Sequence, residues 1–338
     1  MRVGLTYDLR EAYRAQGFDE EATAEFDAPE TIAAIEAVLR RQGLVTERIG
    51  GVRELARRLV EGERFQFVFN IAEGLGGVAR EAQVPALLEA YGIPYTFSDP
   101  LTLALTLDKA MAKRVVRDHG IPTAPFAVIE KEDDLNTVEL PFPLFVKPLA
   151  EGSGKGISAA CHVESPFALK RIGQALLARS LQPLLIETYL PGREFTVGLV
   201  GNGADRRVLG VMEIGFNANA ERFGYSYANK ADYQTRVTYR LVDDEEAQRA
   251  AATALAAWQA LRGRDGGRVD LRSDGHGEPQ FLELNPLPGL HPLHSDLVIL
   301  ARLAGIEYSD LLTLIIEACR KRYRDARHPK AARAVGRE

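Results

Sequence analysis

Strand-like and helix-like patterns of apolar residues alternate over the first hundred residues of the chain. Short apolar runs that predict buried strands cover residues 3–7, 45–49, 65–71 and 93–96. Between these runs, apolar residues recur at helical spacing in residues 31–41, 55–60 and 82–91. Such alternation favours a parallel sheet with helices on its faces. Ligands of such sheets bind beyond the carboxyl ends of the strands, which here means the loops after Tyr7 and Ile71.

The pattern changes after residue 100. One long helix is predicted over residues 101–119, closed by Gly120 and Pro122. Beyond it, short strands outnumber helices, which favours α+β lobes with largely antiparallel sheets. These strands are expected at 142–147, 157–163, 184–190, 195–200 and 208–214, and the helices at 166–178, 245–261 and 311–322. Residues 217–236 lack clear periodicity and are predicted to form a long functional loop.

Charge and cysteine content narrow the range of functions. The formal net charge is -5, whereas a nucleic-acid binder normally carries a basic excess, so no nucleic-acid partner is expected. Cys161 and Cys319 lie far apart and form no Cys-x-x-Cys pair, which predicts reduced thiols without a metal. No apolar run approaches the roughly 18 residues of a membrane span, and the first residues lack a signal-peptide core. We therefore expect a cytoplasmic protein without a membrane partner.

A glycine-rich turn between two predicted strands is the first candidate for chemistry. Glycines let the backbone approach a phosphate closely, so that N–H groups can donate to its oxygens. The sequence fits neither the P-loop nor the dinucleotide-binding fingerprint. A plain hairpin turn is the alternative interpretation. The segment reads Phe145-Val146-Lys147-Pro148, then Glu151-Gly152-Ser153-Gly154-Lys155-Gly156.

Polar side chains on two predicted strands form the second candidate. Arg268 and Asp270 are two residues apart and therefore point to one face, and so do Glu283 and Asn285 on the partner strand. Oxygen ligands of this kind suit magnesium, and closely spaced carboxylates need a cation as counter-charge. The pattern predicts a magnesium site. The alternative is an exposed face with a simple Arg–Asp ion pair.

A third, weaker candidate lies in residues 184–195. An apolar strand there carries Glu187 near its end, and Glu194 follows a turn. The two acids could hold the base and sugar of a nucleotide, or they could be surface carboxylates.

Taken in order, these segments resemble the ATP-grasp enzymes, and most closely the D-alanine–D-alanine ligase family. The resemblance covers about residues 91–318. The motifs that carry it are Gly92-Ile93-Pro94-Tyr95, Ala104-Leu105-Thr106-Leu107-Asp108-Lys109, Val146-Lys147-Pro148, Glu151-Gly152-Ser153, Ile186-Glu187, Glu194-Phe195-Thr196-Val197, Arg268-Val269-Asp270, Glu283-Leu284-Asn285 and Pro288-Gly289.

The resemblance implies an ATP-grasp fold with an N-terminal Rossmann-like domain, of mixed α/β and α+β class. It implies a carboxylate–amine ligase that uses ATP and two magnesium ions, forms an acyl phosphate and serves peptidoglycan biosynthesis. Its substrates are then a small-molecule carboxylate and an amine, and a homodimer through the N-terminal domain is expected. The expected divisions are an N-terminal domain at 1–100, a central lobe at 101–182, a C-terminal lobe at 183–326 and a disordered basic tail at 327–338.

The resemblance also implies roles for single residues. The residues expected to bind ATP are Lys109, Lys147, Ser153, Glu187, Leu190, Glu194, Lys230 and Leu282. Those expected to bind magnesium are Asp270, Glu283 and Asn285. The expected catalytic groups are Arg268 and the amide of Gly289, which would stabilise an oxyanion, and Ser153 in a flap over the phosphates.

Three departures from the family pattern fall at positions that bind the amino acids. The family's Glu after the first strand is missing, although Glu25 or Asp27 could replace it. Ala231 stands where a tyrosine is expected, and the loop at 290–296 is one residue longer. His294 or Ser295 in that loop is expected to bind the second substrate, or else to pack the loop. Two alternatives follow: a ligase for a different amino-acid or hydroxy-acid pair, and a nucleotide-binding protein without turnover.

Overall fold

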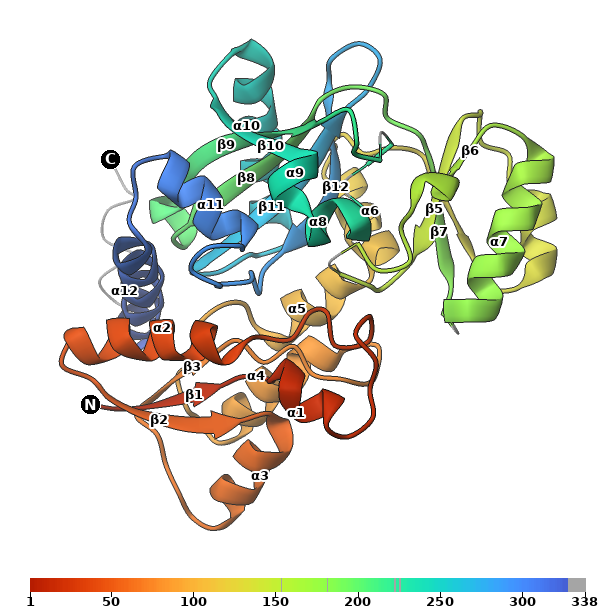
Figure 1. Cartoon of the computed structure of the whole chain (residues 1–338). Coiled ribbons are helices and arrows are strands. Elements are labelled where there is room, and N and C mark those ends of the chain that lie inside the picture. Colours follow the sequence, from red (N-terminus) through yellow and green to blue (C-terminus); the bar gives the residue numbers. More distant parts are fainter. Residues whose placement is uncertain (153, 181, 222, 225, 328–338) are drawn as a thin grey trace.

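The structure is a computed structural model that describes residues 1–152, 154–180, 182–221, 223–224 and 226–327. Figure 1 shows the N-terminal domain below, a lobe around one antiparallel sheet to the right, and a larger sheet above. The two antiparallel sheets face each other across the region that holds the candidate site. None of the described helices is both long enough and apolar enough to cross a membrane.

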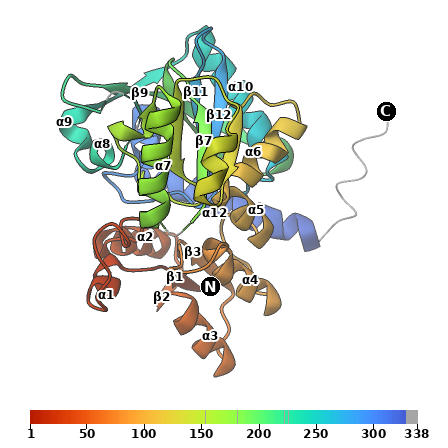
Figure 2. The same ribbon diagram turned by 90° about the vertical axis from the view of Figure 1, so that its right-hand side faces the viewer.

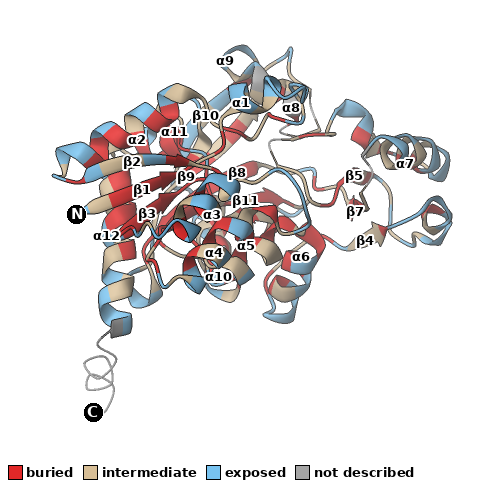
Figure 3. Cartoon of the chain, turned by 90° about the horizontal axis from the view of Figure 1, so that it is seen from below, coloured by how far each residue is buried: buried red, intermediate tan, exposed pale blue. Residues whose placement is uncertain are grey.

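The N-terminal domain has the predicted parallel sheet, with strand order β2-β1-β3. Its buried central strand lies between helices, as the burial colours of Figure 3 show. The elements are β1 (Arg2–Thr6), α1 (Arg10–Arg14), α2 (Pro29–Arg41), β2 (Val45–Gly50), α3 (Val52–Val60), β3 (Phe67–Asn70), η1 (Arg80–Ala82) and α4 (Gln83–Ala90). The strand predicted at 93–96 is wrong: only Tyr95 pairs with Val68, in an isolated bridge.

The single helix predicted over 101–119 is also wrong, because it is broken at Asp108. Helix α5 (Pro100–Leu107) ends there and α6 (Lys109–Asp118) begins. Asp108 has ψ 99, outside the helical range, and its carboxylate accepts a hydrogen bond from the N–H of Met111 at 2.9 Å. An aspartate that caps a helix in this way stabilises it by about 1 kcal/mol. The break places Lys109 on the first turn of α6.

The central sheet has the order β4-β7-β5-β6 with antiparallel pairing, and α7 packs on it (Figure 2). Strand β7 pairs with β4 and β5, so this sheet extends to Thr188. The strand predicted at 157–163 is largely wrong, because a short 3-10 turn precedes the two-residue β6. The elements are β4 (Phe126–Ile129), η2 (Glu132–Thr137), β5 (Leu144–Pro148), η3 (Ala159–Cys161), β6 (His162–Val163), α7 (Pro166–Ser180) and β7 (Leu184–Thr188).

The larger sheet is antiparallel throughout, with the order β10-β9-β8-β11-β12. Helix α10 packs on one face, and α11 and α12 pack on the other. The segment at 217–236 is not structureless, since it carries the short helices α8 and α9. The elements are β8 (Glu194–Val200), η4 (Gly203–Asp205), β9 (Arg207–Phe216), α8 (Tyr227–Ala231), α9 (Tyr233–Arg236), β10 (Val237–Val242), α10 (Glu245–Ala260), β11 (Gly266–Ser273), β12 (Pro279–Asn285), α11 (Asp296–Leu303) and α12 (Tyr308–Arg327).

A buried ionic network joins the N-terminal domain to the larger sheet and α12. Asp265 is completely buried at the start of β11 and pairs with Arg322 of α12 at 2.7 Å. It also accepts hydrogen bonds from the N–H of Phe97 and the amide of Asn202, each at 2.8 Å. One apolar core runs through the same contact, from β1 and α2 to α11 and α12.

We predict that Asp265→Asn lowers the free energy of unfolding by about 3 kcal/mol, because it leaves the Arg322 guanidinium in a buried place without its counter-charge. Asparagine keeps the size of the side chain and tolerates the positive φ of 63 at this position. The matched control is Lys321→Ala, which removes an exposed ion pair with Asp205 from the same helix. It should change stability by less than about 1 kcal/mol. Urea unfolding of the two variants and the wild type measures both values, and equal losses would contradict the account.

Candidate active site

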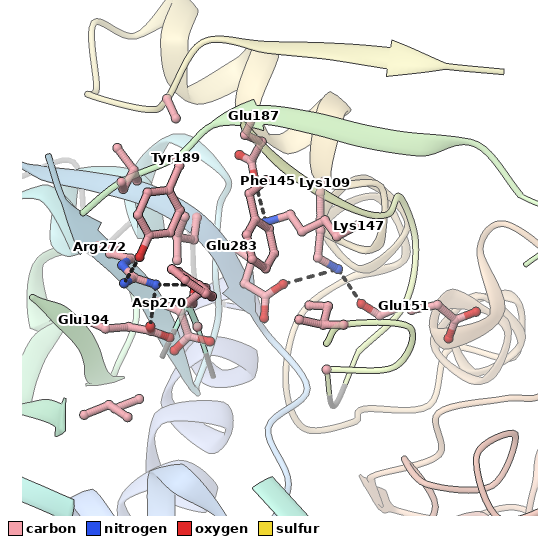
Figure 4. Close-up of a pocket in the computed structure, with 18 of the residues that line it drawn as sticks. Lys109, Phe145, Lys147, Glu151, Glu187, Tyr189, Glu194, Asp270, Arg272 and Glu283 are labelled. Atoms are coloured by element: carbon pink, nitrogen blue, oxygen red, sulfur yellow. Dashed lines mark hydrogen bonds and ion pairs between the residues drawn. The ribbon is translucent and has the colours of Figure 1, made fainter. Parts of the chain in front are cut away.

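Two cavities adjoin at the place where the N-terminal domain and the two antiparallel sheets meet. Both are lined by Lys109, Glu151, Gly152 and Glu283, so these residues lie at the junction. The first cavity lies between the two antiparallel sheets, and Figure 4 shows its lining side chains. The second cavity extends towards the N-terminal domain.

The β11–β12 hairpin positions four of the predicted residues. Asp270 lies opposite Glu283 and Arg268 lies opposite Asn285, because the two strands pair in that register. The amide of Asn285 donates to Asp270 at 3.2 Å and to Glu283 at 3.4 Å. Asp270 also accepts from the hydroxyl of Thr196 on β8, at 2.8 Å. The structure thus brings the three oxygen-bearing side chains together, as the alternating pattern predicts.

Two cations lie beside these carboxylates. Lys109 lies 3.2 Å from Glu283, and Arg268 pairs with Asp270. Burial alone would raise the pKa of Glu283, but Lys109 and Arg268 outweigh burial and hold it far below the usual range. Burial does raise the pKa of Asp270, and Arg268 offsets the effect only in part.

The donor set fits a hard divalent cation in composition. Asp270 and Glu283 offer carboxylate oxygens. The side-chain amide of Asn285 places its oxygen in the same space if the amide group is rotated so that its nitrogen and oxygen exchange places. Within the part of the chain that the structure describes, no three His, Cys, Asp or Glu side chains are grouped to hold a metal. The set is thus two carboxylates and an amide, and bound water or phosphate oxygens must complete the coordination of any ion.

A buried triad of charges lies behind the first cavity. Glu187, at the end of β7, pairs with Lys147 of β5 and with Lys113 of α6, both at 2.5 Å. Burial raises the pKa of Glu187, but the two lysines lower it to about 2. Lys113 is completely buried and also donates to Thr123 at 2.7 Å. The carboxylate of Glu187 is thus neutralised from both sides, and Lys147 is held at the wall of the cavity.

Arg272 and Glu194 line the first cavity together with the apolar residues Leu190 and Leu282. Arg272 lies 3.3 Å from Glu194 and donates to the hydroxyl of Tyr189 and the carbonyl of Phe223, each at 2.9 Å. The contacts of Arg272 with Glu194 and Tyr189 appear on the left of Figure 4. The remaining predicted residues of this cavity are Leu190, Lys230 and Leu282, which also line it. Ser153 lies outside the described residues, but its neighbours Gly152 and Gly154 line the cavity.

The second cavity has acidic walls on the N-terminal side. Its lining includes Arg268 and Gly289, and also Glu73 and Glu81 of the N-terminal domain. Within the described residues, neither of these two glutamates has a hydrogen bond or an ion pair. Burial raises the pKa of Glu81 to about 7, an effect that Arg80 opposes, and burial raises the pKa of Glu73 as well. These two carboxyl groups have raised pKa values because burial disfavours their charged forms, and a positively charged group bound beside them would favour those forms.

The comparisons with known proteins agree with this geometry. The sequence pattern described as "D-ala D-ala ligase C-terminus" matches residues 115–317. The D-alanine–D-alanine ligase of Xylella fastidiosa is 34% identical over 288 residues, which cover 83% of this chain and 90% of the relative. This chain belongs to the D-alanine–D-alanine ligase family.

Two further relatives show the extent of the similarity to the family. The uncharacterized protein y4sG of Sinorhizobium fredii is 36% identical over 261 residues, which cover 76% of this chain and 75% of the relative. The solved D-alanine–D-alanine ligase from Bacillus anthracis, complexed with ATP, has a TM-score of 0.74 and 25% identity, and covers 96% of this chain and 99% of its own. The predicted family and ATP-grasp fold are confirmed.

The loop expected to bind the second substrate of this family has other contacts. The hydroxyl of Ser295 accepts a hydrogen bond from the N–H of His291 at 2.8 Å. His294 is hydrogen bonded to the hydroxyl of Tyr233 in α9, also at 2.8 Å, and stacks on His291. Neither His294 nor Ser295 lines the two cavities described above. Their role in substrate binding stays a prediction.

Sequence reasoning missed four residues of the site: Lys113, Arg272, Glu73 and Glu81. For the two glutamates a signal existed, because they follow the strand whose carboxyl-terminal loop was expected to bind a ligand. The sequence carries no such signal for Lys113 and Arg272, since each resembles an ordinary surface charge until the packing of its helix or strand is known.

Proposed function

We propose that this protein is an ATP-dependent ligase that activates a carboxylate as an acyl phosphate and joins it to an amine. The observation that supports this most is the junction of the two cavities. Lys109, Gly152 and Glu283 belong to both, so a phosphate held there lies beside the space bounded by Arg268 and Gly289. A site that only bound a nucleotide would not need the second cavity.

The residues of the first cavity suit ATP. Its apolar end, with Leu190 and Leu282, would take the adenine, and Glu194 would bind the ribose hydroxyls. Glu187 is paired with two lysines, so we propose that the backbone after it, and not its carboxylate, reads the adenine. Lys109, Lys147 and Lys230, together with the glycine-rich turn, would hold the phosphates.

We propose that Asp270, Glu283 and Asn285 hold two magnesium ions. Bound there, magnesium would neutralise charge on the transferring phosphoryl group. The protein's own contribution is to fix these ligands on paired strands and to keep Lys109 and Arg268 close to them.

In the first step, an oxygen of the substrate carboxylate would attack the γ-phosphorus of ATP, and ADP would leave. Lys109 and Lys147 would stabilise the negative charge on the phosphates during the transfer. In the second step, the amine would attack the acyl carbon and phosphate would leave. The guanidinium of Arg268 and the N–H of Gly289 would stabilise the oxyanion, and each such donor is worth on the order of 3 kcal/mol.

We propose amino acids as the substrates, with D-alanine as the first candidate because the named relatives are D-alanine–D-alanine ligases. Glu73 and Glu81 support this, since two carboxylates in the wall of the second cavity would bind an ammonium group. They also favour an amino acid over a hydroxy acid in that cavity. A pair other than two D-alanines is the second candidate, because these acids come from the loop after β3 and not from the loop after β1.

We further propose that the reaction takes place in the cytoplasm, where ATP is available, and that it serves peptidoglycan synthesis. Both described cysteines are free and buried, which is consistent with a reducing compartment. A homodimer through the N-terminal domain stays a prediction from the family resemblance.

The direct test is phosphate release from ATP and magnesium with a panel of D- and L-amino acids and hydroxy acids. We expect turnover with at least one amino-acid pair. Asn285→Ala should reduce kcat by more than about 100-fold, since even outer groups around a metal ligand are worth about 10- to 100-fold. The matched control, Asn136→Ala, removes an exposed amide far from both cavities and should leave kcat unchanged. If ATP binds but no acid causes turnover, the protein is a non-catalytic nucleotide binder.

The acid pair predicts a pH dependence. With a pKa of about 7, Glu81 is largely neutral below pH 7 and becomes a carboxylate above it. The KM for the amino acid should therefore fall as the pH rises from 6 to 8, while the KM for ATP stays nearly constant. Glu81→Gln should raise the KM for the amino acid and flatten its pH profile. Glu61→Gln, an exposed acid of the same domain, is the control. A KM profile that Glu81→Gln leaves unchanged would exclude the ammonium site.

A further inference from the structure

Four arginines line a surface cavity of about 250 Å³ that shares no lining residue with the two cavities of the active site. Arg206 follows η4, Arg262 and Arg264 lie in the loop between α10 and β11, and Arg322 lies on α12. No carboxylate is among the described residues that line this cavity. The chain as a whole has a net charge of -5, so this concentration of positive charge is local. Such a concentration attracts anions.

Two of these arginines have carboxylate partners outside the cavity lining. Arg322 forms the buried pair with Asp265 described above. Arg264 pairs with Asp99, the residue that caps α5. The charges of Arg264 and Arg322 are therefore balanced within the protein.

The other two arginines have no carboxylate partner in the part of the chain that the structure describes. Arg206 donates to the carbonyl of Gly203 at 2.6 Å and to the side-chain oxygen of Gln259 at 2.5 Å, and both acceptors are neutral. The exposed side chain of Arg262 has neither a hydrogen bond nor an ion pair with a described residue. The cavity thus holds two guanidinium groups whose charge is not balanced.

Trp258 of α10 adds a second, independent sign of a ligand. It lines the cavity and is 1% exposed, and its indole N–H has no acceptor among the described residues. An indole nitrogen can only donate, and a buried donor without an acceptor costs free energy. The arginine-bearing loop packs on this indole, since a Cβ on Gly263 would lie 2.4 Å from the ring. Arg262 has a φ of 59, which side-chain-bearing residues rarely adopt, so the loop conformation is specific.

We propose that this cavity is a second ligand site, which binds the phosphate group of a small molecule mainly through Arg206 and Arg262. Guanidinium groups donate paired hydrogen bonds to phosphate oxygens. A phosphate monoester carries about two negative charges near pH 7, which matches the two unbalanced arginines. Free phosphate and a phosphorylated metabolite share this chemistry. The site is separate from the active site and does not depend on the proposed ligase function.

The test uses the fluorescence of Trp258, because this is the only tryptophan of the chain and it lies in the cavity. The full-length protein is titrated with inorganic phosphate at constant ionic strength, with the active site saturated by a non-hydrolysable ATP analogue. We expect a saturable change in emission, and calorimetry of the same titration should give the same Kd. Arg262→Gln should raise that Kd by at least about tenfold, because it removes charge-assisted hydrogen bonds.

The matched control is Arg207→Gln, which removes an exposed arginine at the position after Arg206 that does not line the cavity. It should change the Kd by less than about twofold, because an exposed charge outside the cavity is screened. The thermal unfolding of ligand-free Arg262→Gln should match the wild type, since its side chain has no partner to lose in the described chain.

A parallel titration with glycerol phosphate separates the two sources of the ligand. Tighter binding of glycerol phosphate would identify a phosphorylated metabolite, and tighter binding of inorganic phosphate would identify the free ion. Sodium chloride at the same ionic strength should leave the emission unchanged. Absence of binding by both emission and calorimetry, or an equal rise in Kd in Arg262→Gln and Arg207→Gln, would refute the site.

Discussion

The arrangement of charged side chains in this active site depends on two carboxylates that face each other on neighbouring strands. Asp270 and Glu283 lie in register on β11 and β12, and like charges so close need cations beside them. Arg268 comes from the same hairpin, but Lys109 comes from the first turn of α6, which begins directly after the break at Asp108. The balance of charge therefore connects the larger sheet to the helices that precede the central sheet. In the proposed function, a metal and a polyphosphate would replace these internal ion pairs.

The same principle recurs on both sides of that cluster. At the first cavity, Glu187 is neutralised by Lys113 and Lys147, and Lys147 is held in the cavity wall. On the other side, Glu25 is neutralised by Arg80 and Lys155, and the contact closes the wall at Gly152. Glu73 and Glu81 differ from these acids, because neither has an ion pair within the described residues, and both line the second cavity. Paired charges thus build walls of both cavities, and two unpaired acids lie in the wall of the second.

The sequence predicts those parts of the site that depend on local pattern. Two-residue spacing places Arg268 and Asp270 on one face, and the hairpin then aligns them with Asn285 and Glu283. It does not predict what depends on long-range packing. The role of Arg272 depends on Phe223 and Tyr189, which lie against it only in the folded chain. The sequence suggests Glu25 as one of two possible substrate-binding acids, but not as the acceptor for the N–H of Gly152. The break at Asp108 was predictable from the sequence, because an aspartate before an amphipathic stretch is a typical helix N-cap.

In the proposed function, this arrangement activates a carboxylate by transferring the γ-phosphoryl group of ATP to it. The most direct measurement uses an amino acid whose carboxylate carries a heavy oxygen isotope, followed by mass spectrometry of the released phosphate. If an acyl phosphate forms and the amine then displaces the phosphate, one labelled oxygen must appear in each phosphate released with product. Product formation accompanied by unlabelled phosphate would contradict the account.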